Sequence, residues 1–422
     1  MPTVALPRAM AYYYMYPFFR TFFHELGVDV AVSPPTTKQT MEKMEFCPTD
    51  EPCLAVKLLF AHAKELLDAG HQDLVIPCLV SLEPHNFCCP KFIGIPYMVQ
   101  NALKNSARIH MFQGKKHWQE TFVAVGRHFG ALPHKVLQAL DRAWQVQHRF
   151  DDALVEKKLT TVEGYRLLES GRLFDTVPAK ALKEPAIGVV GHPYVLYDSF
   201  TLDLLAEFRK YGTVLTAEMV PAAQARREVG TLLEGERLWN FEARILGAGL
   251  YYLRNGLVDK LALVGSFECG PESVIESYLE EEAARRGIPF LLLTLDEHTG
   301  EAGLVTRIEA FMDVTPSRNP SNREAASPPT TPGLRAEKFV IGLPTMGHLD
   351  VAIRSALADC GVESIRTPAA SKEVLELAKL VSPEFVCLPF VITLGQMRWL
   401  LEHGARPFAL PTRGTGGTLL SG

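Results

Sequence analysis

Ile187-Gly-Val-Val-Gly-His-Pro-Tyr194 is a short apolar run that ends at a histidine and a proline. Its length and composition are those of a buried strand. Helical patterns and further apolar runs alternate after it, namely Ser199–Tyr211, Thr213–Ala217, Arg237–Asn255, Leu261–Phe267, Pro271–Arg286 and Pro289–Leu295. Strands that alternate with helices of about 10–15 residues are typical of parallel sheets with helical crossovers. The sequence therefore predicts an α/β fold.

The start of the chain shows the same alternation. We predict strands and helices there in the order Thr3–Leu6, Tyr14–Leu26, Val28–Val32, Leu54–Ala69 and Leu74–Pro77. A long irregular segment, Cys78 to Pro96, follows, and loops of that length inside compact domains are commonly functional. We expect residues 1–185 to form a first α/β domain with a helical cover over about 119–182, and residues 186–313 to form a second.

The end of the chain resembles its beginning. Residues 314–335 are rich in Pro, Ser, Thr, Asn and Arg, as in an exposed linker. After them, Val340-Ile-Gly-Leu-Pro-Thr-Met346 is similar to Val4-Ala-Leu-Pro-Arg-Ala-Met10, and the segment around Cys387 is similar to that around Cys53. Self-similarity of this kind predicts a duplicated module over residues 336–422. The copy is short, and we expect it to stop before its sheet closes.

Charge and hydropathy restrict the class of protein. The net charge of −5 over 422 residues gives no sign of a nucleic-acid partner, which would require a basic face. No uncharged apolar run reaches the length of about 18 residues that a membrane span needs, and the first residues lack a secretion signal. We therefore expect a cytoplasmic protein. In that reducing compartment, cysteines indicate metal binding, catalysis or burial before they indicate disulfides.

Three cysteines lie beside residues that turn the chain. Cys53 follows Asp-Glu-Pro, Cys89 precedes a proline, and Cys269 precedes Gly-Pro, each where a loop leads into a predicted helix. Thiolates are the ligands of iron–sulfur clusters, and helix N-termini stabilise their negative charge. The alternative is plain burial, which is common for cysteine. There is no Cys-x-x-Cys pair, so zinc-ribbon and ferredoxin-type spacings are absent.

The remaining cysteines give weaker signals. Cys88 adjoins Cys89, and we prefer Cys89 as the ligand because it is the one beside Pro90. Cys47, Cys78 and Cys360 are predicted to be packing residues.

Candidate catalytic residues are His192, Glu297 and His298. His192 follows a predicted strand, where open α/β sheets bind ligands, or it holds a turn with Pro193. Glu297 and His298 belong to Asp296-Glu-His-Thr-Gly-Glu301, for which helix capping and loop bracing are favoured over catalysis. No phosphate-binding Gly-x-x-x-x-Gly-Lys-Ser/Thr motif occurs, so we expect no nucleotide on this chain.

Several segments in order resemble one family. They are Leu6-Pro-Arg-Ala-Met10, Ser33-Pro-Pro-Thr-Thr-Lys38, Cys53-Leu-Ala-Val-Lys57, Cys89-Pro-Lys-Phe92, Gly191-His-Pro-Tyr194, Cys269-Gly-Pro271 and Asp296-Glu-His-Thr-Gly-Glu-Ala-Gly303. Together they are similar to the acyl-CoA dehydratase activase-related proteins. These proteins are relatives of the cluster-binding component of 2-hydroxyacyl-CoA dehydratases and of the double-cubane-cluster reductases.

The resemblance implies Rossmann-like domains and a [4Fe-4S] cluster held by Cys53, Cys89 and Cys269. It also implies low-potential electrons from a separate ATP-hydrolysing activator of the actin-like ATPase superfamily, in an anaerobe. The enzyme class stays open between a 2-hydroxyacyl-CoA dehydratase-like lyase, which takes an acyl-CoA substrate, and a component of an ATP-coupled reductase. The type of cluster also stays open between a single cubane and a double cubane shared across a homodimer. Two alternatives compete: a non-catalytic accessory or scaffold subunit, and a cofactor-free α/β protein.

Overall fold

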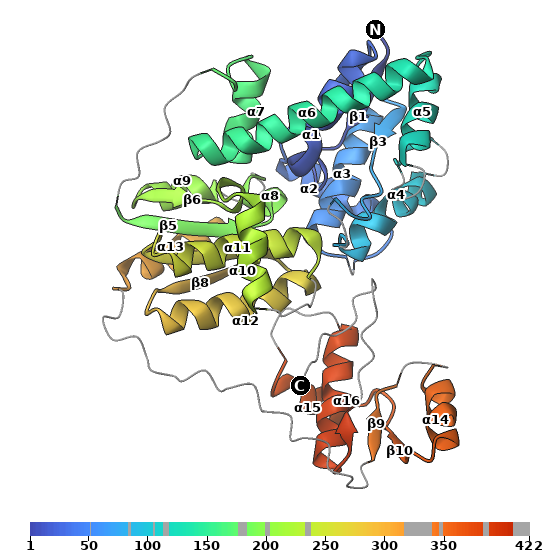
Figure 1. The fold of residues 1–422 in the computed structure, drawn as a ribbon, viewed down its shortest axis with the longest axis vertical. Helices are drawn as coiled ribbons and strands as arrows, with labels where there is room; N and C mark the ends of the chain where they lie inside the picture. Colours follow the sequence, from blue (N-terminus) through green and yellow to red (C-terminus); the bar gives the residue numbers. More distant parts are fainter. Residues whose placement is uncertain are drawn as a thin grey trace. The chain divides into compact units, whose positions relative to one another are not determined.

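A computed structural model describes residues 1–50, 52–82, 86–103, 106–112, 118–175, 184–198, 203–232, 238–315, 340–345, 349–382 and 388–407. The described residues form an α/β protein with three sheets, and every strand pairing in them is parallel (Figure 1). The predicted fold class is therefore confirmed. The part of the chain after residue 340 is described by itself below.

The first sheet has the strand order β2-β1-β3-β4. Its strands are β1 (Thr3–Leu6), β2 (Asp29–Val32), β3 (Asp73–Val75) and β4 (Arg108–His110). The helices between them are α1 (Tyr12–Glu25), α2 (Lys38–Glu42), the 3₁₀ turn η1 (Lys43–Phe46), α3 (Leu54–Asp68) and α4 (Pro90–Leu103). Three more helices cover this part: α5 (Trp118–His128), α6 (Pro133–Lys157) and α7 (Thr161–Glu169). The predicted helical cover is thus present as far as the described residues reach.

Helix α1 packs along the long helix α6, beside which it lies in Figure 1. Pro17 lies inside α1 and disturbs its hydrogen bonding, because proline has no N–H and its ring crowds the preceding turn. The buried side chain of Gln147 inserts at this point: its Oε1 accepts from the Phe18 N–H at 3.2 Å, and its Nε2 donates to the Tyr14 carbonyl at 3.2 Å. The amide from α6 therefore satisfies the polar groups around the proline and holds the backbone of Tyr14 in place.

Asp151 lies one turn after Gln147, which donates a hydrogen bond to it. Burial raises the pKa of Asp151 from 3.8 to about 6, and the nearby charge of Arg244 opposes this shift only in part. The folded protein therefore favours the protonated carboxyl. That contribution to stability is complete below pH 3.8 and is lost as the pH rises through about 6.

We predict that Asp151→Asn removes this pH dependence. At pH 7.5 the variant should exceed the native protein in free energy of unfolding by about 1–2 kcal/mol, and near pH 4 the two should differ little. Urea denaturation at the two pH values measures the difference. Asp152→Asn, at the exposed neighbouring position, is the control. An Asp151→Asn effect of equal size at both pH values would contradict this assignment.

The second sheet has the order β6-β5-β7-β8. Its strands are β5 (Ala186–Gly191), β6 (Thr213–Leu215), β7 (Lys260–Ser266) and β8 (Phe290–Leu295). The intervening helices are α8 (Pro193–Leu196), α9 (Leu204–Arg209), the 3₁₀ turn η2 (Ala217–Met219), α10 (Ala222–Leu232), α11 (Asn240–Arg254), α12 (Gly270–Arg285) and α13 (Glu301–Asp313). β7 is buried along its whole length, as expected of a central strand in a parallel sheet.

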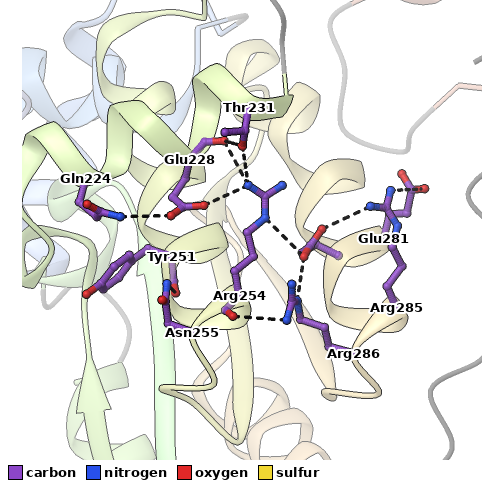
Figure 2. A network of polar contacts seen from close by, with 10 residues as sticks. Gln224, Glu228, Thr231, Tyr251, Arg254, Asn255, Glu281, Arg285 and Arg286 are labelled. Carbon is purple, nitrogen blue, oxygen red and sulfur yellow. Dashed lines mark hydrogen bonds and ion pairs between the residues drawn. The ribbon is translucent and has the colours of Figure 1, made fainter.

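A polar network joins α10, α11 and α12 at the surface (Figure 2). Arg254 at the end of α11 contacts Glu228 Oε2 at 3.0 Å and Glu282 Oε1 at 3.4 Å. Arg286 donates to the same oxygen of Glu282 at 2.8 Å. Because Glu282 is 6% exposed and shared by several guanidinium groups, the network holds the ends of the helices together more firmly than isolated surface pairs do.

The described residues between 340 and 407 contain a small sheet of the order β10-β9-β11. Its strands are β9 (Ile341–Leu343), β10 (Ser364–Arg366) and β11 (Arg406–Pro407), and its helices are α14 (Leu349–Asp359), α15 (Lys372–Lys379) and α16 (Leu388–Glu402). β9 pairs with both neighbours, as β1 pairs with β2 and β3. β11 supplies a third strand, so this sheet has three strands in its described part and the first sheet has four.

Corresponding polar positions support the duplication. The ninth residue of α3 is His62, which is buried and contacts Thr36 Oγ1 at 2.9 Å. The ninth residue of α16 is Gln396, which is also buried and donates to the Pro368 carbonyl at 3.0 Å. In both units this helix position therefore binds the loop that follows the second strand.

Some predicted features lie outside the described residues. They are Cys387, most of the predicted linker (316–335) and residues 176–182 of the helical cover. Within the described part of the chain, no helix combines the length and the apolar character needed to cross a membrane.

Candidate functional site

Each of the three candidate cysteines lies directly before a helix. Cys53 is the N-cap residue of α3, Cys89 precedes Pro90 at the start of α4, and Cys269 precedes Gly270 at the start of α12. The first N–H groups of a helix have no partner within it and carry partial positive charge. All three cysteines thus lie next to the free backbone N–H groups of a helix start.

Cys89 lies within electrostatic reach of two other candidate residues. Burial, together with the charges of Glu242 and Cys53, raises the pKa of its thiol to about 12. At neutral pH the sulfur therefore keeps its proton unless a cation replaces it, and a metal ion or cluster is such a cation. The charges of Glu242 and Cys53 thus both act on the Cys89 thiol.

Cys269 belongs to a compact group of potential ligands. One atom each from Cys269, His192 and Glu242 lies within 4.8 Å of the other two, counting the sulfur, a ring nitrogen and a carboxylate oxygen. His192 follows β5 as the N-cap residue of α8, and Glu242 lies in the first turn of α11. The end of β5 and the helix starts of α11 and α12 therefore supply a mixed set of sulfur, nitrogen and oxygen donors.

His192 is fully buried and tightly surrounded. The Tyr14 hydroxyl lies 2.8 Å from Nδ1, and Glu242 Oε1 lies 3.3 Å from Nε2. The ring also stacks on Tyr194, with centroids 4.7 Å apart. The first domain thus fixes the orientation of this imidazole through Tyr14, the residue whose carbonyl Gln147 binds.

Glu242 is the residue that sequence reasoning missed. Its side chain is 2% exposed, and among the described residues no hydrogen-bond donor reaches Oε2. A buried carboxylate oxygen without a donor is costly, so it suits a site that receives a cation. The available signal was a single acidic residue at the start of an apolar helix, in Trp239-Asn-Phe-Glu-Ala243.

Glu297 and His298 have different surroundings. Glu297 forms an ion pair at 2.5 Å with Lys57, which lies one turn after Cys53 on α3. Burial alone would raise the pKa of Glu297. The hydrogen bond and charge of Lys57, together with a backbone hydrogen bond and the charge of His298, outweigh burial and lower the pKa. Asp296 accepts from the His298 N–H at 3.0 Å and from the Thr299 hydroxyl at 2.6 Å, and His298 itself is exposed. These contacts agree with loop bracing, the role that the sequence favoured.

Two of the three cysteines predicted to pack are buried and one is not. Cys47 and Cys78 are buried, and the Cys78 thiol donates to the Ile93 carbonyl at 3.3 Å. Cys360 is exposed, so the packing prediction is wrong for it. It follows the end of α14, where the helix surface faces solvent.

Comparison with known proteins gives one family. The family described as CoA enzyme activase uncharacterised domain matches residues 3–220, which hold Cys53, Cys89, His192 and Tyr14. No curated protein matches the chain.

Proposed function

The chain belongs to the CoA enzyme activase domain family, and on this premise we propose that it is an iron–sulfur protein that handles low-potential electrons. Cys53, Cys89 and Cys269 would hold a [4Fe-4S] cluster, and an ATP-hydrolysing activator would be the partner that delivers the electron. The observation that carries the proposal is that a carboxylate oxygen of Glu242 lies within 4.8 Å of the Cys269 sulfur, while the charge of Glu242 also raises the pKa of Cys89, which is remote in the sequence.

The donor set fits such a group. Soft thiolates are the ligands that iron–sulfur clusters require, and three of them leave one iron for another donor. The buried Oε2 of Glu242, which lacks a hydrogen-bond donor within the described chain, is an oxygen suited to that position. When bound, a [4Fe-4S] cluster supplies a one-electron centre whose potential depends on the charges and hydrogen bonds around it.

The chain's own residues would hold and tune that centre. The N-termini of α3, α4 and α12 place backbone N–H groups toward negative sulfur, which stabilises the reduced, more negative state. The hydrogen bond of Tyr14 to Nδ1 would hold the His192 imidazole in one orientation beside Cys269, with Glu242 Oε1 3.3 Å from Nε2. Burial of His192 and Glu242 excludes water from this side of the site.

Anaerobic purification followed by iron and sulfide analysis tests the proposal. We expect about four irons per chain and the absorption and paramagnetic resonance spectra of a [4Fe-4S] centre. Reduction by an activase and ATP, but not by the activase with a non-hydrolysable ATP analogue, supports electron handling. A bound cluster that is never reduced in this way supports the accessory role, and a colourless protein without iron contradicts both.

A further inference from the structure

A second group of potential ligands lies in the first sheet, apart from the cysteines. Asp73 is the first residue of β3, His110 is the last residue of the neighbouring strand β4, and His128 ends α5. His110 Nε2 lies 2.9 Å and His128 Nε2 lies 3.1 Å from the same oxygen, Oδ1 of Asp73. Two imidazoles and one carboxylate therefore converge on a single point.

A positive charge already occupies this point. The Arg108 Nη1 atom lies 2.9 Å from Asp73 Oδ1 and 2.7 Å from His128 Nε2. The two contacts of His128 Nε2 have opposite proton requirements, because this nitrogen must carry a proton to donate to Asp73 and must lack one to accept from Arg108. A metal ion in place of the guanidinium nitrogen would satisfy both groups through their lone pairs.

The ligands are held in place by packing. Phe129 contacts both imidazoles, with ring centroids 5.6 Å from His110 and 4.7 Å from His128. His110 is 5% exposed, whereas the Arg108 side chain is 56% exposed and can turn away into solvent. Packing therefore holds the two imidazoles in place, whereas the Arg108 side chain that occupies the site is able to move away.

We propose that Asp73, His110 and His128 bind a divalent transition-metal ion, with Zn²⁺ as the best fit, after displacement of the Arg108 side chain. Zn²⁺ takes imidazole nitrogen and carboxylate oxygen at about 2.0–2.2 Å, and ligand atoms at tetrahedral angles then lie roughly 3.3 Å apart. The observed separations of 2.9 and 3.1 Å need only a small adjustment. A three-ligand site leaves a fourth position for water or another ligand.

The site would join the edge strand β4 to β3 and α5. Its ligands come from β3, β4 and α5, none of which contains a cysteine proposed to hold the cluster. The metal site would thus be independent of the proposed cluster, and its failure would leave the cluster proposal untouched.

Titration of the full-length, anaerobically purified chain with Co²⁺ tests the inference, because Co²⁺ reports its own ligands. We expect one equivalent to bind with the visible absorption of a four-coordinate ion and without thiolate-to-cobalt charge-transfer absorption, and Zn²⁺ to displace it. Arg108→Ala should strengthen binding by about tenfold, since it removes a competing positive charge. His128→Ala should abolish binding, and His134→Ala, at an exposed position on α6, is the matched control.

Three results would overturn the inference. They are the absence of Co²⁺ absorption, absorption that carries only the thiolate band, and binding that His128→Ala leaves unchanged. His128 lies at an exposed helix end, so its replacement should leave the fold intact, as circular dichroism would verify. The comparison of His128→Ala with His134→Ala therefore decides the matter even if Arg108→Ala does not fold.

Discussion

Replacement of Cys53, Cys89 or Cys269 by alanine is expected to abolish stable iron binding. Each cysteine starts a different helix, so each contributes a separate fixed point of the site. A cluster that keeps two protein thiolates exposes more of its iron to solvent and is readily lost. Iron content should fall from about four per chain to near zero in each single variant.

Cys360→Ala is the control for these variants. Cys360 is exposed and directly follows α14, in the part of the chain after residue 340. Its removal should leave the iron content of the anaerobically purified protein unchanged. If all four variants keep the iron content of the native protein, the three cysteines do not form the site. A fall in iron content in Cys360→Ala alone would place the ligands elsewhere.

Gly247→Ala is expected to destabilise the protein by about 3 kcal/mol. A Cβ at this position would lie 2.2 Å from the carbonyl oxygen of Ala225, where α11 packs on the backbone of α10. Because the obstacle is backbone, no side-chain rotation relieves it, and the two helices must separate. α11 also carries Glu242 in its first turn, so the change should weaken iron binding as well.

Gly230→Ala is the matched control. Gly230 lies in α10 and is exposed, and a Cβ added there would meet no atom of the described residues within 4 Å. Alanine should therefore stabilise the helix by about 0.5–1 kcal/mol through its higher helix propensity. Chemical denaturation compares both variants with the native protein. A Gly247→Ala variant as stable as Gly230→Ala would show that α10 and α11 do not pack this closely.

Much of the fold could be predicted from local patterns. The apolar run Ile187–Gly191 corresponds to β5, and the predicted helix Leu54–Ala69 differs from α3 by a single residue. The similarity between the two ends of the chain also predicted a repeated topology, which the order β10-β9-β11 reproduces. The third strand of that repeat was missed, because β11 has only two residues and contains a proline.

The candidate site was only partly predictable. The positions of Cys53, Cys89 and Cys269 before helices follow from their neighbouring proline and glycine residues. Glu242 could not be found in this way, because a glutamate in an amphipathic helix usually faces solvent. Only the tertiary structure, in which α11 packs against α10 and β5, shows that this carboxylate is buried.

The sequence by itself determined the parallel α/β architecture and the helix starts at the three cysteines, and it predicted that the end of the chain repeats its beginning. These depend on apolar periodicity and on turn residues, which act over a few neighbouring positions. The tertiary structure alone decided that Glu242 lies beside His192 and Cys269, and that Asp73, His110 and His128 converge. These residues come together because the crossover connections place the ends of strands and helices that are far apart in the chain next to one another. No local sequence pattern encodes that placement.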